Sequence, residues 1–120
     1  MHELGVVFHI VDEVEKVAKE NNIKHISKVT LEIGEVSTIV PDYFRDCFKW
    51  TTDKSEIMKG CALDLIILKA FTYCESCKNT YETVKHGKTC PNCGSDKTYL
   101  YTGSEVNIKS VETDDEEEGN

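Results

Sequence analysis

The apolar residues among the first twenty positions recur at steps of three and four. This period places one apolar stripe along a helix. The stripe consists of Leu4, Val7, Phe8, Val11, Val14 and Ala18. The pattern therefore predicts an amphipathic helix from about residue 3 to 20, which Asn21 and Asn22 would end.

A change of period follows the first helix. Between residues 28 and 35, Val29, Leu31 and Ile33 alternate with polar residues, which predicts a half-buried strand ending at Gly34. Pro41 is well suited to the first turn of a helix, where its missing N–H costs little. We therefore expect a second helix from Pro41 to about Thr52, with a buried stripe of Phe44, Cys47 and Phe48.

Two further strands are expected. Residues 62–68 are apolar at nearly every position, which favours a central strand covered on both faces. Residues 105–111 regain partial alternation. The expected fold class is α+β: a small mixed or antiparallel three-stranded sheet with two helices, plus an inserted zinc-ribbon-like module with four cysteines. Residues 1–70 and 101–111 would form the α/β domain, residues 71–100 the inserted module, and residues 112–120 a disordered acidic tail.

Composition limits the function classes. No apolar run approaches the roughly 20 residues that cross a bilayer, and the first residues lack the features of a secretory signal, so we expect a cytoplasmic protein without a membrane anchor. The net charge is −8, but six of the 22 acids lie in Glu112–Asn120, so the body is nearly neutral. Neither charge favours binding to nucleic acid, because a protein that binds nucleic acid usually presents a basic face.

Four of the six cysteines form two pairs, Cys74 with Cys77 and Cys90 with Cys93. In a reducing compartment such pairs indicate a metal rather than disulfides. Four thiolates close a tetrahedral shell, which is the geometry of structural zinc and leaves no position for a substrate. A redox Cys-x-x-Cys motif and a rubredoxin-like iron site remain alternatives, because sulfur ligands do not by themselves choose between zinc and iron. Cys47 and Cys61 are interpreted as small core residues.

The N-terminus offers nitrogen donors. The amine of Met1, the amide and imidazole of His2 and the amide of Glu3 can supply four nitrogens in a plane, an arrangement that suits Ni(II) or Cu(II). An exposed polar start to a helix is the alternative reading. Of the other histidines, His9 is read as structural, His25 as a surface residue without an obvious partner, and His86 as a residue that could approach the nickel site.

The chain resembles the HypA/HybF hydrogenase-maturation nickel metallochaperones. The resemblance rests on Met-His-Glu at the start, both cysteine pairs, and segments in the family's order: residues 31–35, 62–65, 90–94 and 103–108. It implies a nickel site at Met1, His2 and Glu3, and zinc on Cys74, Cys77, Cys90 and Cys93.

The resemblance also implies a function. A non-enzymatic metallochaperone would deliver nickel to the [NiFe]-hydrogenase large subunit precursor alongside a HypB-type GTPase. No catalytic constellation or phosphate-binding glycine loop competes with this reading. A zinc-ribbon interaction module of the transcription type is the alternative function, together with the rubredoxin-like iron protein. The sequence leaves the oligomeric state and a role in urease maturation open.

Overall fold

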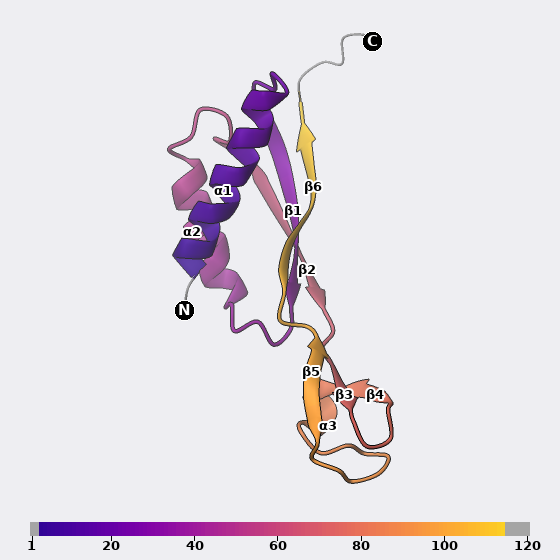
Figure 1. Cartoon of the computed structure of the whole chain (residues 1–120). Coiled ribbons are helices and arrows are strands. Elements are labelled where there is room, and N and C mark those ends of the chain that lie inside the picture. The colour runs from indigo at the N-terminus through magenta and orange to yellow at the C-terminus, as the bar shows by residue number, and fades with distance from the viewer. Residues whose placement is uncertain (1–2, 115–120) are drawn as a thin grey trace. The chain divides into compact units, whose positions relative to one another are not determined.

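The computed structural model describes residues 3–114 of the chain. These residues divide into two compact units. The first unit comprises residues 3–31, 39–65 and 108–114, and the second comprises residues 32–38 and 66–107. Figure 1 labels the helices and strands of both.

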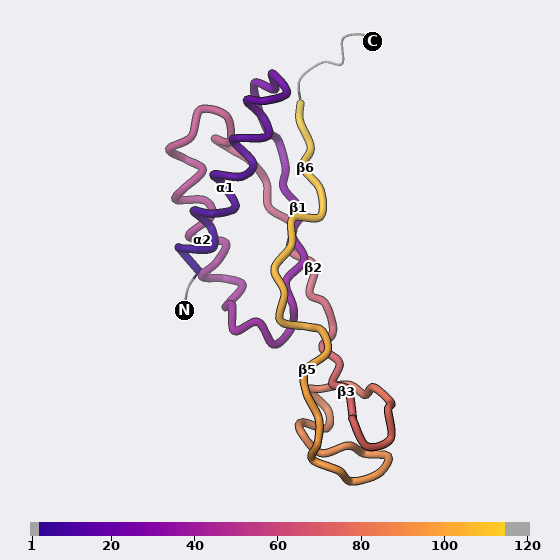
Figure 2. Tube along the Cα trace, viewed as in Figure 1, coloured from indigo at the N-terminus to yellow at the C-terminus, as the bar shows by residue number. Residues whose placement is uncertain are grey.

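Helices α1 (Glu3–Glu20) and α2 (Pro41–Thr52) belong to the first unit and pack against each other. Strand β1 (Ile26–Gly34) is the middle strand of a three-stranded sheet, between β2 (Ala62–Leu68) and β6 (Val106–Thr113). Within the first unit both helices lie on the same side of these strands (Figure 2). The observed bounds of both helices agree with the predicted ones.

The core of the first unit lies between the helices and β1. Val29 and Leu31 of β1 are fully buried, and Phe44, Cys47 and Phe48 of α2 are also buried, as predicted. Ile33 is buried as predicted too, but it belongs to the second unit. On α1 the buried stripe differs from the prediction, because Glu3 and Ile10 are buried while Phe8 is 47% exposed. The ring of Phe8 lies beside Trp50 of α2, with ring centroids 6.5 Å apart.

The prediction that residues 62–68 form a central strand covered on both faces is wrong. Strand β2 is an edge strand, and its Ile66 and Ile67 are 38% and 52% exposed. The sheet has three strands, so β1 alone has a neighbour on each side. A continuous apolar run does not reveal which position in a sheet a strand will take.

The second unit contains another three-stranded sheet in the order β4-β3-β5. Strand β3 (Phe71–Cys74) pairs antiparallel with β4 (Thr80–Glu82) and with β5 (Thr98–Thr102). A single helical turn, α3 (Thr83–His86), follows β4. The short strands leave few buried residues, and the core is a cluster of Cys74, Tyr81 and Cys90 with Cys77 packed against it.

A tight backbone junction in the second unit involves Gly34 and Gly103. The Gly34 N–H donates to the Glu105 carbonyl (2.8 Å), and the Val36 N–H donates to the Gly103 carbonyl (3.0 Å). A Cβ on Gly34 would lie 1.8 Å from the Gly103 oxygen, so these chain segments approach each other too closely for any other residue.

Two carboxylates complete this junction. The Glu35 side chain accepts the Ala70 N–H at 2.6 Å. Glu105 accepts the Thr102 hydroxyl and the Gly103 N–H, both at 2.6 Å. The Thr102 hydroxyl, with the nearby backbone N–H groups, holds the pKa of Glu105 below its usual range.

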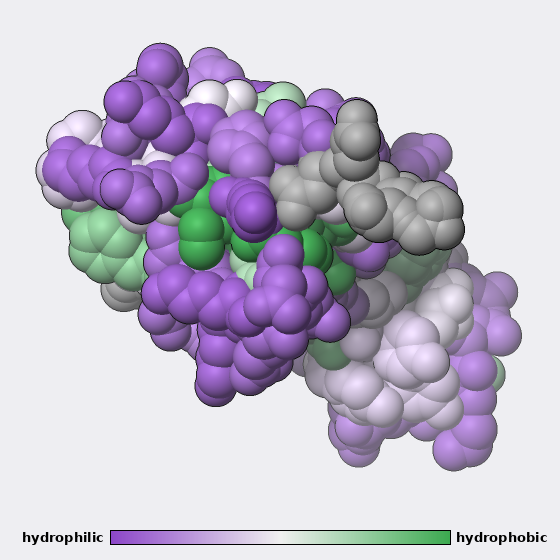
Figure 3. Space-filling view, turned by 90° about the horizontal axis from the view of Figure 1, so that it is seen from above, coloured by the Kyte–Doolittle hydropathy of each residue, from purple (hydrophilic) through white to green (hydrophobic). Residues whose placement is uncertain are grey.

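The observed architecture confirms the expected α+β class with a four-cysteine module. None of the described helices is long and apolar enough to cross a membrane. Apolar side chains do reach the surface in places, within a border of hydrophilic ones (Figure 3).

Candidate metal centre

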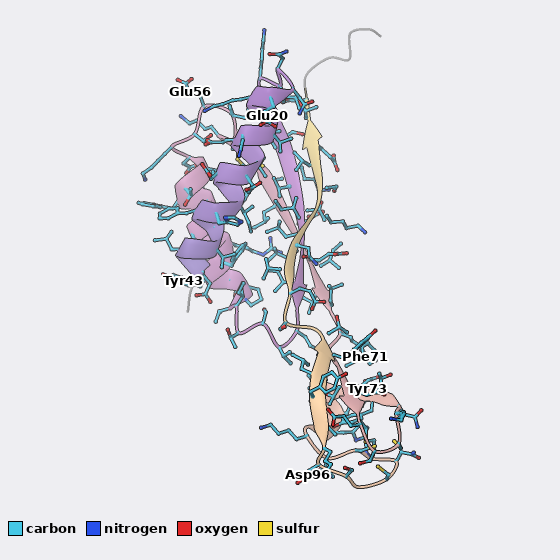
Figure 4. The ribbon with its side chains drawn as sticks, viewed as in Figure 1. Glu20, Tyr43, Glu56, Phe71, Tyr73 and Asp96 are labelled. Atoms are coloured by element: carbon cyan, nitrogen blue, oxygen red, sulfur yellow. The ribbon has the colours of Figure 1, made fainter. Side chains whose placement is uncertain are left out.

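The four paired cysteines come together in the second unit. The Sγ atoms of Cys74 and Cys93 are 3.6 Å apart, and those of Cys77 and Cys90 are 3.7 Å apart. All four sulfur atoms lie within 4.8 Å of one another. Figure 4 shows sulfur atoms gathered among the loops beyond β3 and β5. Among residues 3–114, this is the one group of three or more potential ligands close enough to share an ion.

The spacing of the sulfur atoms fits a tetrahedral ion. With bonds of about 2.3 Å to zinc, the edge of a regular sulfur tetrahedron is about 3.8 Å. The sulfur–sulfur distances of 3.6 and 3.7 Å lie within about 0.2 Å of this value. Cys74 and Cys90 are buried while Cys93 is exposed, so the site lies near the surface with a protected inner half. The residues present therefore fit a zinc ion held by four thiolates.

Two equivalent backbone turns hold the cysteines. In the first, the Lys78 N–H donates to the Cys74 carbonyl (2.8 Å), and the Cys74 N–H donates to the Asn79 carbonyl (2.9 Å). In the second, the Gly94 N–H donates to the Cys90 carbonyl (2.8 Å), and the Cys90 N–H donates to the Ser95 carbonyl (3.0 Å).

In both turns the residue after the second cysteine adopts the left-handed backbone conformation. Lys78 has φ 61° and Gly94 has φ 75°. Glycine adopts this conformation without a steric penalty, whereas lysine does not. The two halves of the site are thus built alike, at a small steric cost in the first half.

The thiols differ in how easily they ionise. The pKa of Cys77 is lowered to about 6, first because of a hydrogen bond with the Asn92 side chain. For Cys93 the Ser95 N–H lowers the pKa, but burial and the three neighbouring sulfurs outweigh it and raise the pKa to about 11. Of these two thiols, Cys77 therefore forms the thiolate more readily, and the thiolate is the form that binds a metal.

The loop between the cysteine pairs is fixed at several points. The Tyr81 hydroxyl donates to the Gly87 carbonyl (2.7 Å), and the Tyr81 ring meets the His86 ring edge-on at 5.8 Å. The Thr98 hydroxyl donates to the Lys88 carbonyl (2.8 Å). His86 thus packs against the core tyrosine of its own unit.

The expected nickel site falls partly on residues outside the described range. Met1 and His2 are not among residues 3–114. Glu3 is the first residue of α1, and its side chain is 1% exposed. Its carboxylate accepts the N–H of Val40, the residue before α2, at 2.8 Å. The burial of Glu3 is a feature that helical periodicity does not predict, because an acidic residue ordinarily faces solvent.

His25 has partners that the sequence did not reveal. Its Nδ1 lies 3.1 Å from both carboxylate oxygens of Asp114, and its Nε2 donates to the Lys59 carbonyl at 2.8 Å. The His25 carbonyl accepts the Thr113 hydroxyl at 2.7 Å. His25 is partly exposed, as a surface residue should be, but it does have partners, since the end of β6 brings residues 113 and 114 beside it. His9, read as structural, is exposed.

The two unpaired cysteines differ. Cys47 is buried in α2, as expected. Cys61 is half-buried, and burial raises the pKa of its thiol to about 11. Neither cysteine is part of the four-sulfur cluster.

Comparison with known proteins agrees with this construction. The family described as "Hydrogenase/urease nickel incorporation, metallochaperone, hypA" matches residues 1–113. The hydrogenase maturation factor HypA of Actinobacillus succinogenes is 31% identical over 111 residues, covering 92% of this chain and 97% of that protein. A second relative, hydrogenase maturation factor HypA 1 of Bradyrhizobium diazoefficiens, is 30% identical over 114 residues, covering 95% and 100%.

A solved structure shows the same fold. The solution structure of the Ni metallochaperone HypA from Helicobacter pylori matches with a TM-score of 0.72 at 27% identity. The match covers 94% of this chain and 97% of that one. With the family match extending from residue 1 to 113, the chain belongs to the HypA family of nickel-incorporation metallochaperones.

Proposed function

We propose that this protein captures one Ni(II) at its first three residues and delivers it for hydrogenase maturation. The ligands are the Met1 amine, the amide and imidazole of His2, and the Glu3 amide. The protein acts as a carrier and not as an enzyme. It passes the ion by ligand exchange to the large subunit precursor of a [NiFe]-hydrogenase, in the cytoplasm and together with a HypB-type GTPase.

The observation that carries this proposal is that α1 begins at Glu3. The first N–H groups of an α-helix have no acceptor within the helix. Binding nickel through the deprotonated Glu3 amide therefore breaks none of the backbone-to-backbone hydrogen bonds of the helix. The buried Glu3 side chain, bonded to the Val40 N–H, supports the proposal further because it fixes the position of the residue that follows His2.

Zinc has a separate, structural role in the proposal. Cys74, Cys77, Cys90 and Cys93 would hold it, and the closed thiolate shell would stabilise a unit that has few buried residues of its own. The same shell fits iron, and elemental analysis with visible absorption separates the two metals. We expect about one zinc per chain and no absorption from iron–thiolate bonds.

Nickel titration of the untagged protein tests the N-terminal site. Three proteins are compared by calorimetry and visible spectroscopy: wild type, His2→Ala, and a chain extended by Gly-Ser before Met1. Both changes should abolish the specific nickel band and lower affinity by at least about a hundredfold, because each removes a ligand of the chelate. Zinc content and circular dichroism should stay unchanged.

The extended chain gives the sharper test. It keeps every side chain but converts the terminal amine to an amide and moves His2 from position 2. A spectrum and affinity equal to wild type in the extended chain would rule out the amine as a ligand. Nickel should also be released as pH falls through the histidine range, since amine, imidazole and amides must all lose protons to bind.

A further inference from the structure

The exposed side of the α1–α2 pair carries three aromatic residues. Phe8, Tyr43 and Trp50 are 47%, 53% and 53% exposed. We call them the aromatic face. Figure 4 labels Tyr43 near the beginning of α2, beside the beginning of α1. Exposed tyrosine and tryptophan are the side chains that most often dominate the energetics of protein–protein contacts.

Trp50 stands between two hollows of the first unit. One has a volume of about 320 Å³ and is lined by Leu4, Tyr43, Asp46, Cys47 and Trp50. The other, of about 310 Å³, is lined by Phe8, Val11, Glu15, Trp50, Thr51, Lys54 and Ser55. A ridge of aromatic rings with a hollow on each side can receive apolar side chains from a partner.

The charges around Trp50 are not equivalent. The Lys54 amine lies 3.5 Å from the Trp50 ring centroid, and Glu15 accepts the Ser55 hydroxyl at 2.5 Å. Both charged groups of the second hollow therefore already have contacts within the chain. The first hollow has an exposed carboxylate, Asp46, in a wall that is otherwise apolar and aromatic. A basic group next to an apolar side chain is complementary to this wall, because it pairs with the Asp46 carboxylate.

The aromatic face lies close to the start of the chain. Leu4 lines the first hollow, and three residues of chain reach at most about 10 Å. An ion bound at residues 1–3 is consequently within about 10 Å of Leu4. A protein docked over Trp50 would have the nickel within reach of its own ligands.

From these observations we propose that the aromatic face docks a partner protein that presents an apolar side chain flanked by lysine or arginine. Trp50 is the anchor, and Asp46 pairs with the basic group. The proposal rests on the proposed function, since it identifies the surface where the protein that exchanges nickel binds. It does not depend on which atoms hold the ion.

Binding measurements on single variants test the proposal. The probes are the purified HypB-type GTPase and the hydrogenase large subunit precursor of the same organism, each titrated calorimetrically against the full chain. Trp50→Ala should weaken binding of at least one of them by about thirtyfold, as for an anchor residue. Asp46→Asn should weaken the same complex by about fivefold and reduce its dependence on salt.

Two control variants match these changes. Tyr101→Ala removes a ring that is 65% exposed on β5 in the second unit. Glu20→Gln neutralises an exposed acid at the last residue of α1, at the opposite end of the helix from its first residue (Figure 4). Both controls should bind as wild type. Circular dichroism, zinc content and nickel affinity of all four variants should equal wild type, which separates docking from folding and from metal capture.

The single tryptophan of the chain provides a direct readout. A protein labelled with 5-fluorotryptophan gives one fluorine resonance, from Trp50, which should shift when the unlabelled partner is added. The proposal would be overturned if the Trp50→Ala variant bound both partner proteins as tightly as wild type does. It would also be overturned if the wild-type protein bound neither of them. A self-associating wild type that Trp50→Ala converts to monomer, with partner binding intact, would assign the face to a second copy instead. If the wild-type protein bound no nickel but did bind a partner through Trp50, the proposed function would be refuted and the docking proposal would stand.

Discussion

Replacing Gly34 with alanine is a stringent test of the junction in the second unit. The added Cβ would lie 1.8 Å from the Gly103 oxygen and 2.1 Å from its carbonyl carbon. Real Cβ contacts stay beyond about 3 Å, so the two backbones must separate by roughly 1 Å. No flexible side chain is present at this contact to give way, because the nearest atoms belong to the backbone.

The cost follows from the hydrogen bonds that this movement breaks. The bonds from Gly34 to Glu105 and from Val36 to Gly103 are 2.8 and 3.0 Å long and would both open. Each contributes about 1 kcal/mol, and a polar group left buried costs up to about 3 kcal/mol. We expect Gly34→Ala to lower the free energy of unfolding by about 3 kcal/mol or more, a large part of the total for a small domain.

Urea unfolding measures this loss. With a slope of about 2 kcal/mol per molar urea, the midpoint should fall by about 1.5 M. A zinc-sensitive dye follows the second unit, and Trp50 fluorescence follows the first. The matched control is Gly5→Ala, whose Cβ meets nothing within 4 Å and which should stabilise the helix by up to about 1 kcal/mol. Equal midpoints for wild type and Gly34→Ala would refute the reasoning.

Two further predictions concern the metal centre. Cys90→Ser should lose the bound zinc and the tertiary structure of the second unit. Elemental analysis would show the first loss, and the near-ultraviolet circular dichroism of Tyr73 and Tyr99 the second. Retained zinc would contradict the four-thiolate site. Lys78→Gly should stabilise the second unit by up to about 1 kcal/mol, because residue 78 is left-handed, while Gly94→Ala should destabilise it by a similar amount. Urea unfolding followed by zinc release compares both with wild type, and effects of the opposite sign would exclude the equivalence of the two turns.

The sequence by itself determined the elements whose apolar residues follow one period. Both long helices begin and end where periodicity, Asn21–Asn22 and Pro41 place them, and β1 presents Val29, Leu31 and Ile33 to the core. The cysteine spacing likewise identified the cluster. A chelating pair with two residues between its cysteines is a local feature, and two such pairs suffice to form a closed shell.

Tertiary structure decided what depends on neighbours distant in sequence. The apolar run of β2 could have been central or at an edge, and the three-stranded sheet made it an edge. Phe8 continues the apolar stripe of α1 but lies outside the core beside Trp50, while the acidic Glu3 is buried with its carboxylate accepting the Val40 N–H. Gly34 and Gly103 are 69 positions apart, and only their contact in space explains why Gly34 cannot carry a side chain. Gly103 is restricted by Ala70, whose Cα would lie 2.3 Å from an added Cβ. Periodicity reports which face of an element is apolar, but the partner of that face is set by the packing of the whole chain.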